Sequence, residues 1–210
     1  AIITAGTSTG DGYYWLINPN VNGGLKFRVY CDMTKDGGGW ILVHTARGDA
    51  ISHMGWTTSN IGLRNQTAPS IVDAYSILSW SDQLKKSGAW QWMIEATESV
   101  NTRYTYGGIF TANINSYSLV ANVPTQTNVT ANEWFSPLSG FADSSGHGGR
   151  VPWVNTGNYE PSDALFTTYP GSSSWWGTIT QLNANVDSYA TGPWISSTMQ
   201  APNWKRLWIR

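Results

Sequence analysis

The amino-acid sequence predicts an α+β domain that is rich in strands and has few helices. Apolar and polar residues alternate over residues 26–30, 90–96 and 204–210, as they do in strands with one buried face. Clusters of Asn, Pro and Gly, which favour tight turns, lie between the predicted strands. A helical period is visible in one stretch, residues 70–88, and a chain of 210 residues is most simply a single domain.

The first strands are predicted within residues 11–47. An aromatic strand that contains Tyr13, Tyr14 and Trp15 leads into an Asn-Pro-Asn turn, in which Pro fixes φ and Asn tolerates positive φ. A second strand follows at residues 26–30 and runs into a polar turn. Because aromatic side chains of this size usually serve packing, we interpret these residues as part of the core.

Alternation in the second strand places Phe27 and Val29 on one face and the charged residues on the other. The three glycines at residues 37–39 allow the backbone to bend sharply or to approach another strand closely. Trp40 follows these glycines directly, and we expect it to anchor the core.

One helical segment is predicted, over residues 70–88. Ser70 can cap its start, Gly88 can end it, and Ser79 can cap a further short turn over residues 82–86. The apolar residues that recur at helical spacing are Ile71, Val72, Tyr75, Leu78 and Leu84.

The rest of the chain divides by composition. Residues 48–70 resemble a loop, and residues 103–135 are predicted to hold short strands between Asn- and Gly-rich turns. Residues 90–96 predict a central strand and residues 204–210 a final one. Residues 1–10 are small and polar, as in a linker or a connection to a preceding stalk.

Three short motifs near the N-terminus point to a family. Tyr-Cys-Asp-Met at residues 30–33 is followed by Gly-Gly-Gly-Trp at residues 37–40 and by Ile-Leu-Val at residues 41–43. This run resembles the opening of fibrinogen-like C-terminal domains, which belong to the fibrinogen-related and intelectin-like lectin superfamily. The resemblance implies one fibrinogen-like domain with a twisted, mainly antiparallel sheet, few short helices and long C-terminal loops. It also implies a recognition module that binds glycans or proteins.

On this basis the chain divides into residues 1–10, a linker or stalk connection, and residues 11–210, a fibrinogen-like recognition domain. Residues 11–100 would form its N-terminal part and residues 101–210 its ligand-binding C-terminal part. Because such domains commonly cap elongated oligomeric stalks, the resemblance also suggests that the chain is a piece of a longer protein.

Composition narrows the classes of partner. The chain has 12 Lys and Arg against 13 Asp and Glu, a net charge of −1 without the concentrated basic surface that nucleic acid requires. No stretch of the sequence is long and apolar enough to predict a membrane-spanning helix. The 13 Trp and 10 Tyr residues, set among Ser, Thr, Asn and Gly, suit an extracellular surface that contacts sugars. Sugar C–H faces stack on indole rings, while amide and hydroxyl groups bond to sugar hydroxyls.

Cys31 is the one cysteine of the sequence, so it has no partner for an intrachain disulfide. We therefore expect the chain to fold in a reducing compartment, with Cys31 as a small buried apolar residue. Secreted eukaryotic members of the resembled family carry paired cysteines, so a single cysteine favours a bacterial or bacteriophage protein.

Residues 140–194 are the segment in which a functional site is most expected. The segment is long, rich in Gly, Pro and Ser, and nearly without regular periodicity, and long loops of this kind in a compact domain tend to be functional. In fibrinogen-like lectins the C-terminal third carries the ligand and calcium sites, so the resemblance points to this segment. An adjacent Trp pair on a strand faces both ways, which leaves one ring available to a ligand unless both are buried. The predicted ligand-binding residues are Trp153, Asn158, Tyr159, Trp175, Trp176 and Trp194.

A calcium site is a second expectation for the same segment, because Ca²⁺ takes six to eight oxygen ligands from carboxylates, carbonyls and water. The paired Asp-x-Asp typical of the resembled family is missing, and a solvated loop is the alternative. The predicted metal ligands are Asp143, His147, Glu160 and Asp163.

Catalysis has little support in the sequence. The three histidines are scattered without metal-ligand spacing, and no nucleophile elbow is present. We therefore expect no enzyme, but a receptor-binding domain for a cell-surface glycan or protein, at the tip of a phage tail fibre or a bacterial adhesin. A homotrimer that is folded in cytosol and acts on the virion or cell surface fits this hypothesis. The alternatives are a structural capsid or fibre decoration without ligand and a polysaccharide-degrading enzyme.

Overall fold

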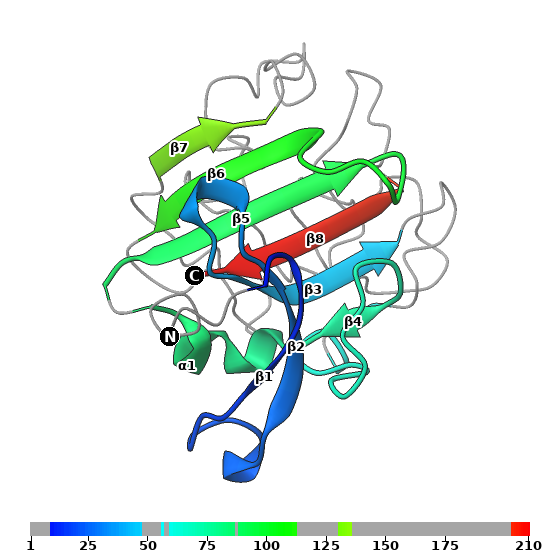
Figure 1. Ribbon diagram of the computed structural model, residues 1–210. Helices are drawn as coiled ribbons and strands as arrows, with labels where there is room; N and C mark the ends of the chain where they lie inside the picture. Colours follow the sequence, from blue (N-terminus) through cyan, green and yellow to red (C-terminus); the bar gives the residue numbers. More distant parts are fainter. Residues whose placement is uncertain (1–8, 48–55, 57–58, 87, 113–129, 136–202) are drawn as a thin grey trace, which may run out of the picture.

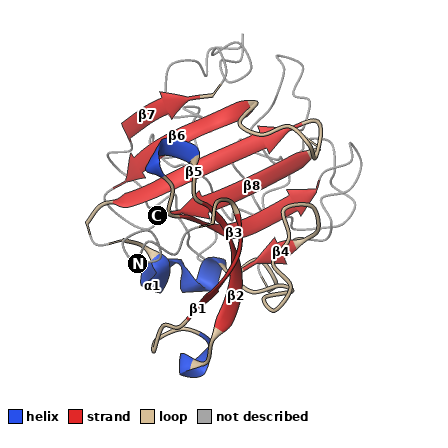
Figure 2. Cartoon of the chain, in the orientation of Figure 1, coloured by secondary structure: helices blue, strands red, loops and turns tan. Residues whose placement is uncertain are grey.

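The computed structural model describes residues 9–47, 56, 59–86, 88–112, 130–135 and 203–210, and these residues form the fold. Strands dominate it (Figure 2). The strands are β1 (Gly12–Leu16), β2 (Phe27–Asp32), β3 (Trp40–Arg47), β4 (Tyr75–Ser76), β5 (Trp90–Thr97), β6 (Tyr106–Ala112), β7 (Thr130–Trp134) and β8 (Trp204–Ile209).

All these strands belong to one sheet, in the order β1-β2-β3-β8-β5-β6-β7, with the short β4 paired to β3. Every pairing between strands of the sheet is antiparallel, which confirms the predicted sheet type. The final strand β8, which is red in Figure 1, lies between β3 and β5 in the middle of the sheet. The strands predicted at residues 26–30, 90–96 and 204–210 are all present.

The hairpin of β1 and β2 crosses in front of the sheet and projects beyond it in Figure 1. Its register pairs Tyr13 with Tyr30, Tyr14 with Val29, and Leu16 with Phe27. Alternate residues therefore face the core, and Phe27 and Val29 are 4% and 0% exposed, as the alternation predicts.

Helices are few and short, as expected: η1 (Asn22–Gly24), η2 (Lys35–Gly37), η3 (Leu78–Trp80) and α1 (Ser81–Leu84). The prediction of a helix over residues 70–88 is wrong, because this stretch holds a bend, β4, η3 and the single turn of α1. The predicted cap by Ser79 is also wrong, since Trp80 occupies the N-cap position of α1 and no side chain caps it.

Tertiary contacts explain why residues 70–88 do not form a helix. The carbonyl of Ser70 accepts a hydrogen bond from the Thr45 hydroxyl, and that of Ile71 accepts one from Arg206 Nε. The Ser70 hydroxyl does accept bonds from two backbone N–H groups, as a cap would, but these close only a local turn. Residues 74–78 are all buried, so this run packs on every side and has no helical stripe.

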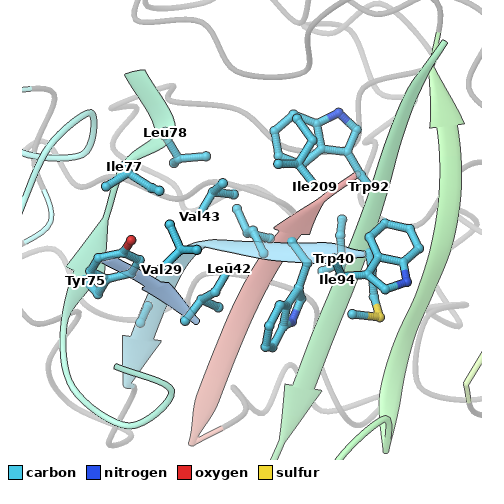
Figure 3. Packing of buried hydrophobic residues seen from close by; sticks show 14 of the residues in the cluster. Val29, Trp40, Leu42, Val43, Tyr75, Ile77, Leu78, Trp92, Ile94 and Ile209 are labelled. Carbon is cyan, nitrogen blue, oxygen red and sulfur yellow. The ribbon is translucent and has the colours of Figure 1, made fainter. Parts of the chain in front are cut away.

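The core forms where β3, β8 and β5, which all carry buried Trp residues, lie side by side in the sheet. Figure 3 shows Trp40 and Leu42 of β3 close to Trp92 and Ile94 of β5 and to Ile209 of β8. Trp40 is 0% exposed, which confirms it as the predicted core anchor. Among the described residues, no helix has the length and apolar character needed to span a bilayer.

Candidate functional site

The residues predicted to contact a ligand or calcium lie outside the described residues, within residues 136–202. They are Trp153, Asn158, Tyr159, Trp175, Trp176 and Trp194 for the ligand, and Asp143, His147, Glu160 and Asp163 for calcium. Within the described part of the chain, no group of three or more metal-binding side chains comes together.

A row of large side chains lies exposed along the projecting hairpin. Tyr13, Trp15 and Ile17 occupy alternate positions of β1 and its continuation, so they share the outer face, and their exposed fractions are 53%, 61% and 74%. Leu25, on the returning side of the hairpin, is 68% exposed. We call Tyr13, Trp15 and Ile17 the hairpin row. Exposed aromatic side chains that gather on one face mark interaction surfaces more often than scattered ones do.

Cations and neighbouring rings hold the aromatic members of the row in place. The Arg28 guanidinium lies 4.6 Å from the centre of the Tyr13 ring, and Lys26 Nζ lies 5.1 Å from the centre of the Trp15 ring. Tyr13 also meets Tyr30 edge-on, with the ring centres 5.1 Å apart. Tyr30 in turn contacts the buried Trp208 of the central strand, so the row is attached to the core.

The interpretation of this segment as core is therefore right for Trp40 but wrong for Tyr13 and Trp15. The sequence of β1 already indicated that some of these rings are exposed. Adjacent residues of a strand face opposite sides, so Tyr13, Tyr14 and Trp15 cannot all point inward at once. What the sequence does not show is that the outer face stays uncovered, because that depends on how the hairpin projects from the sheet.

A cluster of buried charges joins this hairpin to the sheet. Glu95 of β5 is 0% exposed, and its Oε1 lies 3.0 Å from Arg206 Nη1 and 2.6 Å from Arg103 Nε. Arg103 Nη2 also lies 3.0 Å from Oδ2 of Asp32, the last residue of β2. The Tyr104 hydroxyl donates to the same carboxylate oxygen. Two carboxylates and two guanidiniums thus link β2, β5 and β8.

The pKa of Asp32 shows that its carboxylate is held as an anion. Burial alone would raise the pKa of Asp32, but hydrogen bonds from Tyr104, Lys35 and Thr34 and the charge of Arg103 lower it below its usual value. Burial alone would likewise lower the pKa of Arg103, yet Glu95, which accepts its hydrogen bond, raises it. Because these groups neutralise one another, the cluster holds β2, β5 and β8 together. The Asp of the Tyr-Cys-Asp-Met motif, Asp32, therefore has a structural role as a member of this cluster.

Two further buried polar side chains, His44 of β3 and Lys205 of β8, lie where these strands pair. His44 and Lys205 are 0% and 3% exposed, and within the described residues neither ring nitrogen of His44 nor Nζ of Lys205 has a hydrogen-bond partner. Burial lowers the pKa of Lys205 to about 7. Burial, followed by the charges of Lys205 and Arg64, lowers the pKa of His44 well below its usual range.

These two groups predict that stability rises with pH. Unfolded Lys205 keeps its proton up to about pH 10.4, whereas the folded protein releases it near pH 7. The unfolded state therefore binds more protons between these values, and the free energy of unfolding increases across this window. His44 acts in the same direction below about pH 6.5, where its unfolded form becomes charged.

Lys205→Met is expected to raise the free energy of unfolding at pH 7 by roughly 2 kcal/mol or more and to flatten its rise towards pH 10. Chemical denaturation at pH 7, 8.5 and 10 measures both effects. Lys86→Met, at an exposed lysine, is the control and should follow the wild-type curve. Parallel curves for wild type and Lys205→Met would show that Lys205 is not buried as a neutral amine.

Comparisons with known proteins agree with this fold. The family model of the C-terminal globular domain of fibrinogen beta and gamma chains matches residues 2–69. The fibrinogen-like globe domain of human ANGPTL2 is 12% identical in sequence with a TM-score of 0.51, over 99% of this chain and 95% of that chain. No curated protein matches the sequence.

Two further solved structures are similar at lower TM-scores. The lamprey fibrin D-dimer, complexed with the peptide ligand Gly-His-Arg-Pro-amide, is 14% identical with a TM-score of 0.49, over 99% of this chain and 71% of that chain. The fibrinogen-like globe domain of human ANGPTL6 is 12% identical with a TM-score of 0.47, over 99% and 92%. The family model and the ANGPTL2 domain together show that the chain has a fibrinogen-like fold, and the family model covers the part that holds the Tyr-Cys-Asp-Met and Gly-Gly-Gly-Trp motifs.

Proposed function

We propose that this chain is a recognition domain that binds a glycan or a protein on a cell surface, as the tip of a phage tail fibre or of a bacterial adhesin. The observation that carries the proposal is the hairpin row, because it presents rigidly held aromatic side chains to solvent on a fibrinogen-like fold. Such rings add contact area without a large loss of side-chain entropy on binding.

Cys31 supports the assignment to a bacterial or phage protein that folds in a reducing cytosol and acts on the virion or cell surface. Cys31 is 2% exposed and free, and burial followed by the charge of Asp32 raises the pKa of its thiol to about 12. The thiol therefore stays protonated and unreactive, and the N-terminal half folds around it without a disulfide.

The proposal includes the C-terminal residues predicted from the sequence as additional ligand contacts, with Trp153, Tyr159 and one of Trp175 and Trp176 as stacking rings. A homotrimer belongs to it as well, since several weak sites on one fibre tip give a useful affinity through avidity. We propose that the domain binds its ligand without catalysis.

The test is retention of the purified, fluorescently labelled chain on a panel of bacterial strains and on a glycan array. Saturable binding to some surfaces and not to others is the expected result. Retention on no surface would instead favour a structural decoration of a capsid or fibre. Shortened chains or new reducing ends after incubation with host polysaccharide would favour a degrading enzyme.

Calcium is tested separately, on stability. If Asp143, His147, Glu160 and Asp163 hold Ca²⁺, a chelator should lower the melting temperature and added calcium should restore it, because a ligand bound only by the native state stabilises it. At a calcium concentration of about 100 times Kd the expected shift is about 5–11 °C. Asp163→Asn should reduce the shift, while a melting temperature that ignores the chelator would remove calcium from the proposal.

A further inference from the structure

We infer that the hairpin row binds an acid-bearing glycan, a sugar chain whose rings stack on Tyr13 and Trp15 while its carboxylates meet Arg28 and Lys26. This inference rests on the proposed function, since it names the ligand class of the same surface. It assigns a binding site to the N-terminal hairpin, separate from the C-terminal residues that the sequence pointed to.

The charge of the hairpin favours an anion. The hairpin, residues 12–32, contains Lys26, Arg28 and one acid, Asp32, whose carboxylate is paired with Arg103. Within the described part of the chain neither cation forms an ion pair, and the Nε atom of Arg28 is buried without a hydrogen-bond partner. Both cations lie over rings of the row, so an anion placed beside those rings meets them directly.

The acidic residues next to the hairpin do not cancel this charge. Asp11, just before β1, accepts hydrogen bonds from the Met33 N–H at 2.7 Å and from the Thr34 hydroxyl, and it lies 4.0 Å from Arg103. At the far end Asn18 donates to the Gln83 carbonyl of α1. That helix and the residues after it carry Asp82 but also Lys85 and Lys86. The hairpin therefore keeps a net positive face.

The spacing of the row suits a chain of rings. Residues i, i+2 and i+4 of a strand lie about 6.5–7 Å apart along one face, so Tyr13, Trp15 and Ile17 form a straight line of three contacts. With 61% of its surface exposed, Trp15 keeps area for a ligand although Lys26 lies against its ring. Contacts to Arg28 and Tyr30 fix the Tyr13 ring before the ligand arrives, which lowers the entropy lost on binding.

The size and charge of the surface disfavour a protein as its occupant. A stable protein interface uses roughly 20–30 residues a side, whereas the row with Leu25, Lys26 and Arg28 is a narrow strip. A two-fold contact between copies of this chain would place the same surface on both sides, and therefore bring the cations of one copy against those of the other. A glycan that is narrow, anionic and rich in rings needs neither the large contact area of a protein interface nor a contact between like charges.

The experiment uses the full chain and two matched probes, polygalacturonate and the same polymer with its carboxylates methyl-esterified, together with an array of acidic and neutral glycans. The variants are Trp15→Ala and the double variant Lys26→Gln/Arg28→Gln. Leu63→Ala, at a leucine that is 41% exposed outside the hairpin, and Arg47→Gln, at an exposed cation that ends β3, are the matched controls. Melting temperature and near-ultraviolet circular dichroism confirm that each variant is folded.

Wild type should bind acidic glycans in preference to neutral ones, and should bind polygalacturonate more tightly than its ester. Trp15→Ala should weaken this binding about tenfold. The double variant should weaken it similarly and should also lose the dependence on salt, because screening acts on the cation–carboxylate contacts. Both controls should bind as wild type does.

Equal binding of acidic and neutral probes, binding that both hairpin variants leave unchanged, or no binding to any probe would overturn the inference. A Trp15→Ala variant that sediments as a smaller oligomer than wild type would identify the row as an interface between copies, and would overturn it as well. Retention on bacterial cells by wild type and by both hairpin variants alike would overturn the inference and leave the proposed function standing. If wild type is not retained on any bacterial cell, both the inference and the proposed function would be overturned.

Discussion

Replacement of Glu95 by Ala is expected to lower the free energy of unfolding by about 3–5 kcal/mol, because it leaves a buried charge without its partner. In a domain of this size the melting temperature would fall by about 6–20 °C. Thermal unfolding followed by circular dichroism measures the effect.

The contacts of Glu95 explain why the effect is large. Its Oε2 accepts a hydrogen bond from the Trp208 indole at 3.2 Å, and its Oε1 neutralises Arg206, which is 0% exposed. Without the carboxylate, the Arg206 side chain keeps only one hydrogen bond within the described residues, from Nε to the Ile71 carbonyl at 2.7 Å. Moving a guanidinium out of water without a counter-charge is far more expensive than losing one hydrogen bond.

The control is Glu98→Ala, which removes an exposed carboxylate just beyond the same strand and should change stability little. A double variant, Glu95→Leu with Arg206→Met, should be less destabilised than Glu95→Ala alone, since apolar residues of similar volume can replace a buried ion pair. If Glu95→Ala melts with the control, the cluster contributes nothing to stability and the description of Glu95 as a structural link is wrong.

Gly38→Ala should destabilise the fold by at least about 3 kcal/mol, more than its position in a surface turn suggests. Gly38 has φ +74° and ψ −166°, a region that is essentially restricted to glycine. A Cβ at this position would also overlap the backbone carbonyl of Met33. The loop would have to move, although it is bonded to Arg210, which donates to the Asp36 carbonyl at 2.6 Å and lies 4.3 Å from the Trp40 ring.

Gly37→Ala is the matched control, because Gly37 also has positive φ, at +77°, but a Cβ there meets no atom within 4 Å. Only the intrinsic strain of roughly 1–2 kcal/mol remains at this position. Urea denaturation of both variants separates the close backbone approach from the left-handed conformation. Equal losses for the two variants would show that the approach of Gly38 to Met33 is not tight in solution.

The candidate site is less accessible to sequence reasoning than the fold. Alternation assigns Lys26 and Arg28 to the polar face of a strand and Trp15 to a neighbouring strand, yet their stacking depends on the pairing of Trp15 with Arg28 across the hairpin. Glu95 and Arg206 are separated by 111 positions, and no local pattern indicates that they meet. The helix expected over residues 70–88 fails for the same reason, because side chains of distant strands occupy the carbonyls that a helix would need.

The sequence by itself determined where most strands run and which of their faces carry apolar residues, because alternation is a property of neighbouring residues. It also determined the fibrinogen-like opening, since the glycines and the buried Trp40 serve a turn that is closed locally. Only the tertiary structure decided that β8 enters the middle of the sheet, that Asp32, Glu95, Arg103 and Arg206 share one buried cluster, and that the outer face of β1 stays in solvent. These features arise from pairings between segments far apart in the chain, whose free energy is set by burial and electrostatics and not by local preference.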